Sequence, residues 1–126
     1  MHVGFSPGAM AITADGCTAY LTNFGWPGTG DTVTPVNLAT GKPGRAITVG
    51  KGPTAIAITP DGKTAYVVNS GQDNGHTVTP INLATGQPGR PIKVGKDPVA
   101  ITITPNGRIA YVSNGLSDTI TPIRIR

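Results

Sequence analysis

The fold is decided by residues 57–69, which read AITPDGKTAYVVN, and by residues 77–86, which read TVTPINLATG. Both stretches occur earlier in the chain, as AITADGCTAYLTN at 11–23 and TVTPVNLATG at 32–41. They occur again later, as TITPNGRIAYVSN at 102–114 and TITPIRI at 119–125. Asp15 and Asp61 lie 46 residues apart, and Asp61 and Asn106 lie 45 apart. The chain is therefore built from a repeat of about 45 residues.

Each repeat is expected to form four short β-strands. In the second repeat these are 54–59, 64–69, 77–83 and 90–94, and turn residues such as Asp61-Gly62 separate them. The strands do not alternate clearly between apolar and polar residues, which is typical of sheets that are covered on both faces. A small sheet that needs neighbours on both sides, repeated every 40 to 50 residues or so, is the blade of a β-propeller. We therefore predict an all-β propeller fold.

The 126 residues form one domain with three repeat units, at about 3–48, 49–93 and 94–126. The third unit ends after its third strand, while residues 1–3 align with the end of a fourth strand. Propellers generally have about 4 to 8 blades, so three blades are not expected to close alone. We expect a homo-oligomer, either a dimer with six blades or a trimer with nine, in which a neighbour's N-terminus supplies the missing strand. A fragment of a larger seven-bladed propeller is the alternative.

Composition excludes several classes of protein. Gly (18), Pro (12) and 18 Thr favour turns and strands, and only 13% of the residues are charged. The single Cys17 cannot form an intramolecular disulfide, and no Cys/His cluster has the spacing of a zinc site. The ten basic residues are spread along the chain, so we predict no nucleic-acid partner despite the net charge of +4. No apolar run is long enough for a membrane span, and the N-terminus has no signal-peptide region.

Several polar or unusual residues recur in every repeat, which favours structural roles for them. Asp15, Asp61 and Asn106 are expected to stabilise turns, because Asp and Asn side chains bond their own backbone there. A second set closes the second strand of each repeat: Asn23, Asn69 and Asn114. A proline recurs inside the third strand, as Pro35, Pro80 and Pro122, and we expect a bulge there because proline cannot donate to a sheet ladder.

The quoted segments resemble the YVTN family of β-propeller repeats. The resemblance rests on residues 57–69 and 77–86, with sister copies YLTN at 20–23 and YVSN at 111–114, and it covers essentially the whole chain. It implies a propeller that is typically seven-bladed, in a family common among surface-layer, secreted and periplasmic proteins and often labelled lactonase-like. An extracellular or cell-surface location is implied by the resemblance alone.

Catalysis by this chain is not expected. The resemblance implies a Glu for metal binding or acid/base chemistry, as in related propeller lactonases and lyases. This chain contains no Glu. We therefore predict a non-catalytic scaffold for ligand or protein recognition or for self-assembly, with no cofactor and no metal site. A lactonase-like or lyase-like propeller enzyme is the alternative. Carbohydrate and protein ligands are both left open.

Departures from the repeat mark the candidate ligand site. The loops after Asn23 and Asn69 are longer than the loop after Asn114, and they carry the least repetitive residues of the chain. Such loops are expected on the same face as the connections between blades, where propeller ligands usually bind. The candidate site residues are Phe24, Trp26, Asp31, Lys51, Asp73, Asn74, His76 and Lys96.

Overall fold

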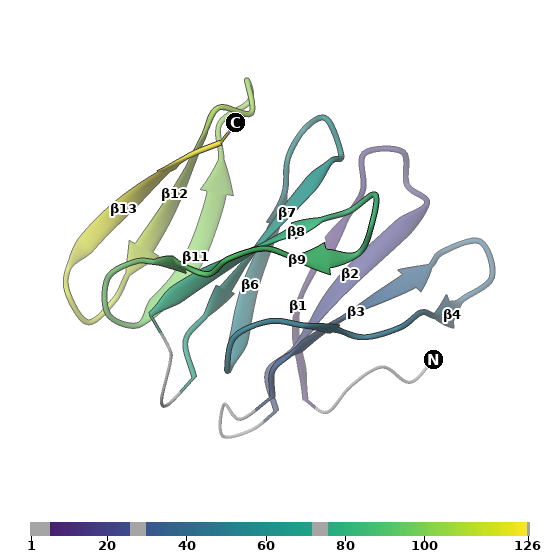
Figure 1. The fold of residues 1–126 in the computed structure, drawn as a ribbon, viewed down its shortest axis with the longest axis horizontal. Coiled ribbons are helices and arrows are strands. Elements are labelled where there is room, and N and C mark those ends of the chain that lie inside the picture. Colours follow the sequence, from purple (N-terminus) through teal and green to yellow (C-terminus); the bar gives the residue numbers. More distant parts are fainter. Residues whose placement is uncertain (1–5, 26–29, 72–75, 126) are drawn as a thin grey trace.

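The computed structural model describes residues 6–25, 30–71 and 76–125. The described residues form three antiparallel sheets that follow one another along the chain (Figure 1). We call these sheets blades 1, 2 and 3. The predicted all-β fold is confirmed, and no helix capable of crossing a membrane occurs in the described ranges.

Blade 2 shows the complete repeat. Its three long strands are β6 (Pro53–Ile58), β7 (Thr64–Asn69) and β8 (Thr77–Asn82), and they pair in that order. The outer edge of β8 pairs with two short segments, β9 (Gln87–Pro88) and β10 (Ile92–Lys93). The predicted fourth strand at 90–94 is therefore too long, because the chain pairs only briefly before it crosses to the next blade.

The other two blades follow the same plan. Blade 1 contains β1 (Pro7–Ile12), β2 (Thr18–Asn23), β3 (Thr32–Asn37), β4 (Lys42–Pro43) and β5 (Ile47–Thr48). Blade 3 contains β11 (Pro98–Ile103), β12 (Ile109–Asn114) and β13 (Thr119–Arg124), and no outer segment pairs with β13 among the described residues. The first strands of the blades lie side by side, because β1 and β11 both contact β6.

The prediction of a bulge at the recurring proline is wrong. Pro35 pairs in regular register with Tyr20, and Pro80 pairs likewise with Tyr66. The carbonyl of Pro35 accepts a hydrogen bond from the N–H of Gly44 (2.7 Å), on the outer side of the strand. The proline nitrogen points to that same side, because both backbone groups of a residue in an antiparallel ladder face one neighbour. The absence of an N–H at Pro35 therefore removes no hydrogen bond between β3 and β2.

The irregularities lie in the first strand of each blade instead. The register shifts between Pro7 and Met10, between Pro53 and Ala55, and between Pro98 and Ala100. The prolines at the strand starts were not recognised as the bulge signal, although proline is confined to such positions within sheets.

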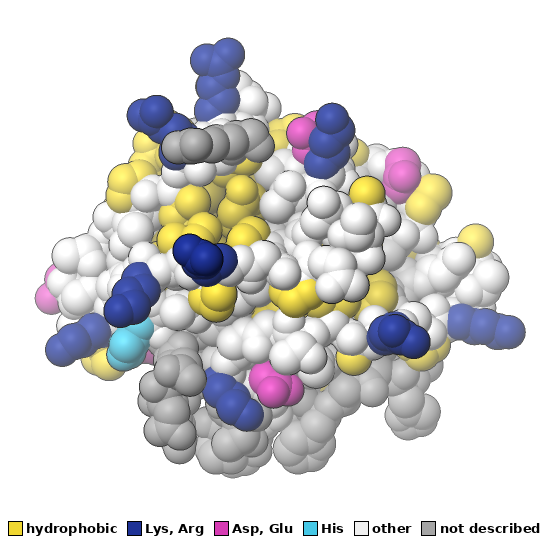
Figure 2. Space-filling view, in the orientation of Figure 1, with side chains coloured by type: hydrophobic (Ala, Val, Ile, Leu, Met, Phe, Trp, Pro, Cys, Tyr) yellow, Lys and Arg dark blue, Asp and Glu magenta, His cyan; other side chains and the backbone are white. Residues whose placement is uncertain are grey.

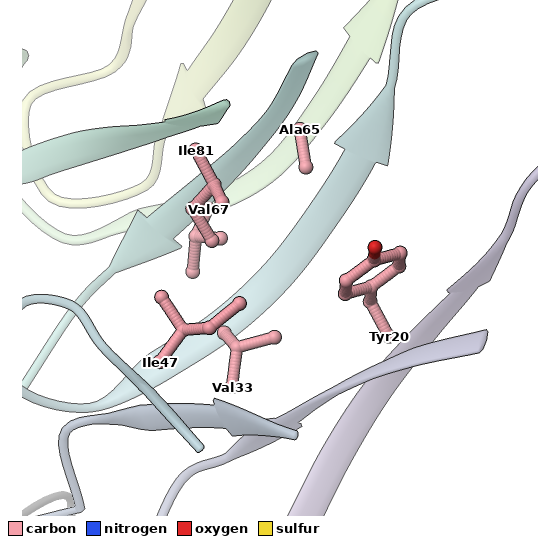
Figure 3. Close-up of a cluster of buried hydrophobic side chains, with 6 residues drawn as sticks. All are labelled: Tyr20, Val33, Ile47, Ala65, Val67 and Ile81. Atoms are coloured by element: carbon pink, nitrogen blue, oxygen red, sulfur yellow. The ribbon is translucent and has the colours of Figure 1, made fainter. Parts of the chain in front are cut away.

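The core lies between the blades and has two parts. Between blades 1 and 2, six side chains are buried together (Figure 3): Tyr20, Val33, Ile47, Ala65, Val67 and Ile81. Between blades 2 and 3, a second set is buried: Tyr66, Val68, Val78, Ala110, Val112 and Ile123. Alternate residues of β7 serve the two parts, so blade 2 is apolar on both faces, as predicted.

The two end blades each have one face that lacks such a cover. Tyr66 is 7% exposed, whereas its repeat equivalent Tyr111 in blade 3 is 40% exposed. Val78 is fully buried, whereas its equivalent Ile120 is 65% exposed. On blade 1, Met10, Ile12 and Leu38 are exposed, while their blade 2 equivalents pack against the first core cluster: Ile56, Ile58 and Leu83. We call the Tyr111–Ile120 surface and the Met10–Ile12–Leu38 surface the two open faces.

The recurring Asp and Asn residues stabilise the turns, as predicted. The Asp61 carboxylate accepts hydrogen bonds from the Thr59 hydroxyl (2.6 Å) and the Lys63 N–H (2.9 Å). Asn106 accepts the equivalent bonds from Thr104 and Arg108. Because the first two repeats use a carboxylate and the third an amide, only the first two turns can titrate.

We expect protein stability to fall in acid, and Asp61→Asn to weaken this fall. The hydrogen bond from the Thr59 hydroxyl, followed by that from the Lys63 N–H, lowers the pKa of Asp61 below its usual value. A carboxylate with a lowered folded pKa stabilises the fold above its unfolded pKa of about 4 and loses that contribution as pH falls through the folded pKa. Thermal unfolding midpoints measured between about pH 7 and pH 2 check this.

The third repeat provides the matched control for that experiment. Asn106→Asp places a carboxylate in the same turn geometry and should steepen the loss of stability in acid. The account would be wrong if Asp61→Asn and Asn106→Asp left the pH dependence of the midpoint unchanged.

Candidate functional site

One face of the molecule gathers the loops that follow the second strands and the connections between blades. The Lys51 carbonyl accepts a hydrogen bond from the Gly71 N–H (2.9 Å), and the Gly52 carbonyl accepts from Ser70 (2.9 Å). The same pattern recurs at the next connection, where the Lys96 and Asp97 carbonyls accept from Leu116 and Gly115. We call this the loop face; it lies at the bottom of Figure 1. The turns stabilised by Asp15, Asp61 and Asn106 lie at the opposite end.

Buried asparagines hold the loop face to the sheets. The Asn69 amide donates to the hydroxyls of Thr77 (3.2 Å) and Thr79 (2.9 Å), and Asn69 is fully buried. Asn23 and Asn114 make the same bridge in the other blades. These residues join the second strand to the third, which places the start of each third strand firmly beneath the loops.

Two glycines let the blade connections pass close over these asparagines. A Cβ on Gly50 would lie 2.8 Å from Asn69 Cγ, and a Cβ on Gly95 would lie 2.7 Å from Asn114 Cγ. Real Cβ atoms do not approach so closely. The backbone at these two positions can therefore lie against the buried amides only because the side chain is a hydrogen atom.

The structure places five of the eight predicted site residues, and it joins four of them in two pairs. Asp31 and Lys51 form an ion pair (3.6 Å) beside the connection between blades 1 and 2. His76 and Lys96 line one pocket beside the connection between blades 2 and 3. Phe24 is half-buried, and its N–H donates to the Ser6 carbonyl (3.1 Å). Trp26, Asp73 and Asn74 lie outside the described residues.

The pocket between blades 2 and 3 has a volume of about 530 Å³. Its lining includes the first residues of two third strands, Thr77 and Thr119, together with Ser117, and the basic residues Lys93 and Lys96. Figure 2 shows Lys and Arg side chains standing out from the surface of the molecule. His76, Lys93 and Lys96 are all exposed to solvent, so they can meet a ligand without rearrangement of the core.

Sequence reasoning missed Lys93 as a member of this pocket. Its segment, β10, lies at the outer edge of blade 2. However, β10 pairs Lys93 with Thr77, at the start of β8, and so brings it to the loop face. The signal was available, because Lys93 aligns with Thr48 and thus departs from the repeat.

Few ionisable groups converge elsewhere. Within residues 6–25, 30–71 and 76–125, no group of three or more His, Cys, Asp or Glu is placed to hold a metal ion. Cys17 is exposed, and its thiol lies near the Asp15 carbonyl in the turn (3.7 Å). The loop face therefore carries the strongest candidate site of the described structure.

The chain is similar in structure to β-propeller proteins. It matches hydrazine synthase of Kuenenia stuttgartiensis with a TM-score of 0.85 and 32% identity, over 98% of this chain and 35% of that one. It matches a putative 6-phosphogluconolactonase of Bacteroides fragilis with a TM-score of 0.80 and 23% identity, over 100% of this chain and 36% of that one. It matches the β-propeller domain of Myceliophteria thermophila Cps50 (Swd1) with a TM-score of 0.80 and 16% identity, over 99% of this chain and 37% of that one.

These matches establish the fold. The chain is a partial β-propeller of three blades, and it spans about a third of the length of each of these structures. No family model and no curated protein matches the sequence. Since propellers host unrelated functions, the fold alone assigns no activity.

Proposed function

We propose that the chain is a non-catalytic propeller scaffold of the YVTN repeat type, which assembles through its two open faces and presents its loop face for recognition. In this proposal residues 1–126 act as one partial propeller domain with units 3–48, 49–93 and 94–126. The observation that carries the proposal is the exposure of apolar side chains whose repeat equivalents are buried, above all Tyr111 against Tyr66 and Ile120 against Val78.

The two open faces are complementary because they repeat the two sides of an existing interface. Blade 2 presents Tyr66 and Val78 to blade 3, and blade 3 presents Tyr111 and Ile120 to solvent at the equivalent positions. Blade 2 packs its Ile56 side against blade 1, and blade 1 exposes the equivalent side. Blade 3 of one copy can therefore receive blade 1 of a second copy in a head-to-tail contact.

A ring of two copies is the proposed assembly. Two chains give six blades, within the usual range of about 4 to 8, whereas three chains give nine. In a closed ring each open face meets its complement, so no apolar blade face is left in water. The residues at the N-terminus that align with a fourth strand lie outside the described residues, and their pairing with a neighbour stays a prediction.

Light scattering of the purified chain tests the assembly. We expect a folded species of about twice the single-chain mass of 12.8 kDa. Ile120→Asp and Ile12→Asp should each shift the protein towards single chains, because an unpaired carboxylate is costly to bury in an apolar interface. Mixing the two variants should restore a two-chain species, since each retains the face that the other has lost. A species of three chains, with nine blades, would change the proposed ring size but not the proposed head-to-tail contact.

The control substitution is Leu116→Asp. Leu116 is 74% exposed but lies in the turn between β12 and β13, outside both open faces, so this change should leave the mass unaltered. A stable, folded wild-type protein of 12.8 kDa would overturn the assembly proposal.

A lactonase-like activity is the second candidate function. It is favoured by the structural likeness to two Bacteroides proteins described as putative 6-phosphogluconolactonases, at 23% and 19% identity. A screen for lactone hydrolysis with and without divalent metal ions separates the two candidates. Clear turnover by the purified chain would replace the scaffold proposal with the enzyme.

A further inference from the structure

The two blade connections of the loop face differ in charge although their backbones are equivalent. The Val49 N–H donates to the Asp31 carbonyl (2.7 Å), and the Val94 N–H donates to the His76 carbonyl (2.9 Å). Asp31 and His76 therefore occupy the same place in successive repeats, as do Lys51 and Lys96. Between blades 1 and 2 the lysine is neutralised by the carboxylate of Asp31 (3.6 Å). Between blades 2 and 3 an imidazole replaces that carboxylate.

A second substitution between the repeats adds positive charge at the same place. Lys93 pairs with Thr77 across the sheet, just as Thr48 pairs with Thr32 in blade 1. Where blade 1 has Asp31 and Thr48, blade 2 thus has His76 and Lys93. Lys93, Lys96 and His76 all line the pocket of about 530 Å³, and within residues 6–25, 30–71 and 76–125 no Asp or Glu lines it.

Hydroxyl groups complete the set of donors. Ser117 Oγ and Thr119 Oγ1 lie 2.7 Å apart and share one hydrogen bond. The Asn114 amide also donates to Thr119 Oγ1 (3.3 Å), so that oxygen already serves as an acceptor. Whichever hydroxyl donates within the pair, the other retains a hydrogen for a partner outside it. Both residues line the pocket.

Two described acidic residues adjoin the pocket in sequence but do not line it. Asp97 follows Lys96, and its Oδ2 lies 3.6 Å from where a Cβ on Gly115 would stand. Asp118 lies between Ser117 and Thr119 in sequence. Neither carboxylate is among the groups that line the pocket.

We propose that the pocket between blades 2 and 3 binds the oxyanion group of a small organic molecule, through Lys93, Lys96, His76 and the hydroxyls of Ser117 and Thr119. Charge-assisted hydrogen bonds from ammonium groups to an oxyanion are stronger than neutral ones, and hydroxyls add direction. The apolar side chain of Val94 also lines the pocket and can receive the carbon skeleton of the ligand. The proposal rests on the recognition half of the proposed function and names its ligand class.

An NMR titration of the full chain tests this site, with inorganic phosphate, sulfate and acetate as probes and sodium chloride balancing the ionic strength. We expect saturable shifts of the amide signals of Thr77, Gly95 and Ser117 with an oxyanion and none with chloride alone. The phosphate and sulfate arms, set against acetate, distinguish a phosphate or sulfate ester from a carboxylate as the group that is bound.

Exchange of the two equivalent residues gives matched variants. His76→Asp recreates the blade 1 pairing with Lys96 and should weaken oxyanion binding about tenfold or more. Asp31→His removes the carboxylate that neutralises Lys51 and should strengthen oxyanion binding beside Thr32 and Gly50. Equal affinity in wild type and His76→Asp, or shifts of the same size with chloride, would overturn the proposal.

The site can be tested apart from assembly, because both of its blades belong to one chain. The titration is repeated on Ile12→Asp, whose substitution lies on the open face of blade 1. Binding that persists in single chains supports the site even where the assembly proposal fails. If the wild-type protein forms the two-chain species but binds none of the oxyanions, only the proposal of the binding site is overturned.

Discussion

Ile81→Ala should lower the free energy of unfolding by about 2–5 kcal/mol, a large share of the total stability of a domain. Ile81 is fully buried and lies against Val67 in the cluster between blades 1 and 2 (Figure 3). Removal of its outer carbons leaves a cavity that the paired strands on either side cannot easily collapse to fill. Urea unfolding at one fixed protein concentration measures the effect, since assembly makes apparent stability concentration-dependent.

Leu116→Ala is the control for this measurement. Leu116 loses a similar apolar side chain at a position that is 74% exposed, so we expect a change within about 0.5 kcal/mol. Similar losses for Ile81→Ala and Leu116→Ala would contradict the assignment of the core to the space between the blades.

Asn69→Ala should destabilise the protein by about 2–4 kcal/mol. The Asn69 amide bridges Thr77 and Thr79, and the hydroxyl of the buried Thr79 would lose this donor. Within the described residues the Asn69 Oδ1 has no hydrogen-bond partner, so the stabilising part of the side chain is its amide nitrogen. The free energy of unfolding, again from urea titration, checks this.

Asn82→Ala is the matched comparison. Asn82 is exposed, and its side-chain oxygen accepts bonds from the Ala84 and Thr85 N–H groups in a turn. Those N–H groups can form hydrogen bonds with water when the side chain is removed. We therefore expect the free energy of unfolding to fall by about 1 kcal/mol or less. An equal or larger loss at Asn82 would show that the buried bridge does not hold the second and third strands together.

Most of the fold could be predicted from the sequence because the same pattern of strand and turn residues occurs three times. The predicted strand at 64–69 and the predicted turn at Asp61-Gly62 are both confirmed. There the turn residues and the β-branched residues that follow favour the same local structure. The recurring prolines were misread because the sequence does not show which side of a strand its nitrogen faces. That side depends on which neighbour the strand pairs with, and hence on the whole sheet.

The candidate site could be predicted only in part. The departures from the repeat marked His76 and Lys96, and the structure brings them to one pocket. Ser117, Thr119 and Lys93 were missed because they come from a turn, a third strand and an outer segment of two different blades. Their proximity depends on how blades 2 and 3 pack, which no single repeat encodes.

The recurring proline of the third strand also affects which strands can pair with the outer edge of a blade. An exposed sheet edge invites further strands wherever it offers a regular row of N–H donors. On β13, which has no outer partner in the described part of the chain, Pro122 interrupts that row at the middle of the strand. A strand of another molecule that paired along this edge of β13 would meet no N–H donor at the position of Pro122. Regular pairing along the whole edge is thereby discouraged, whereas short segments can still pair on either side of the proline, as β4 and β5 do beside Pro35.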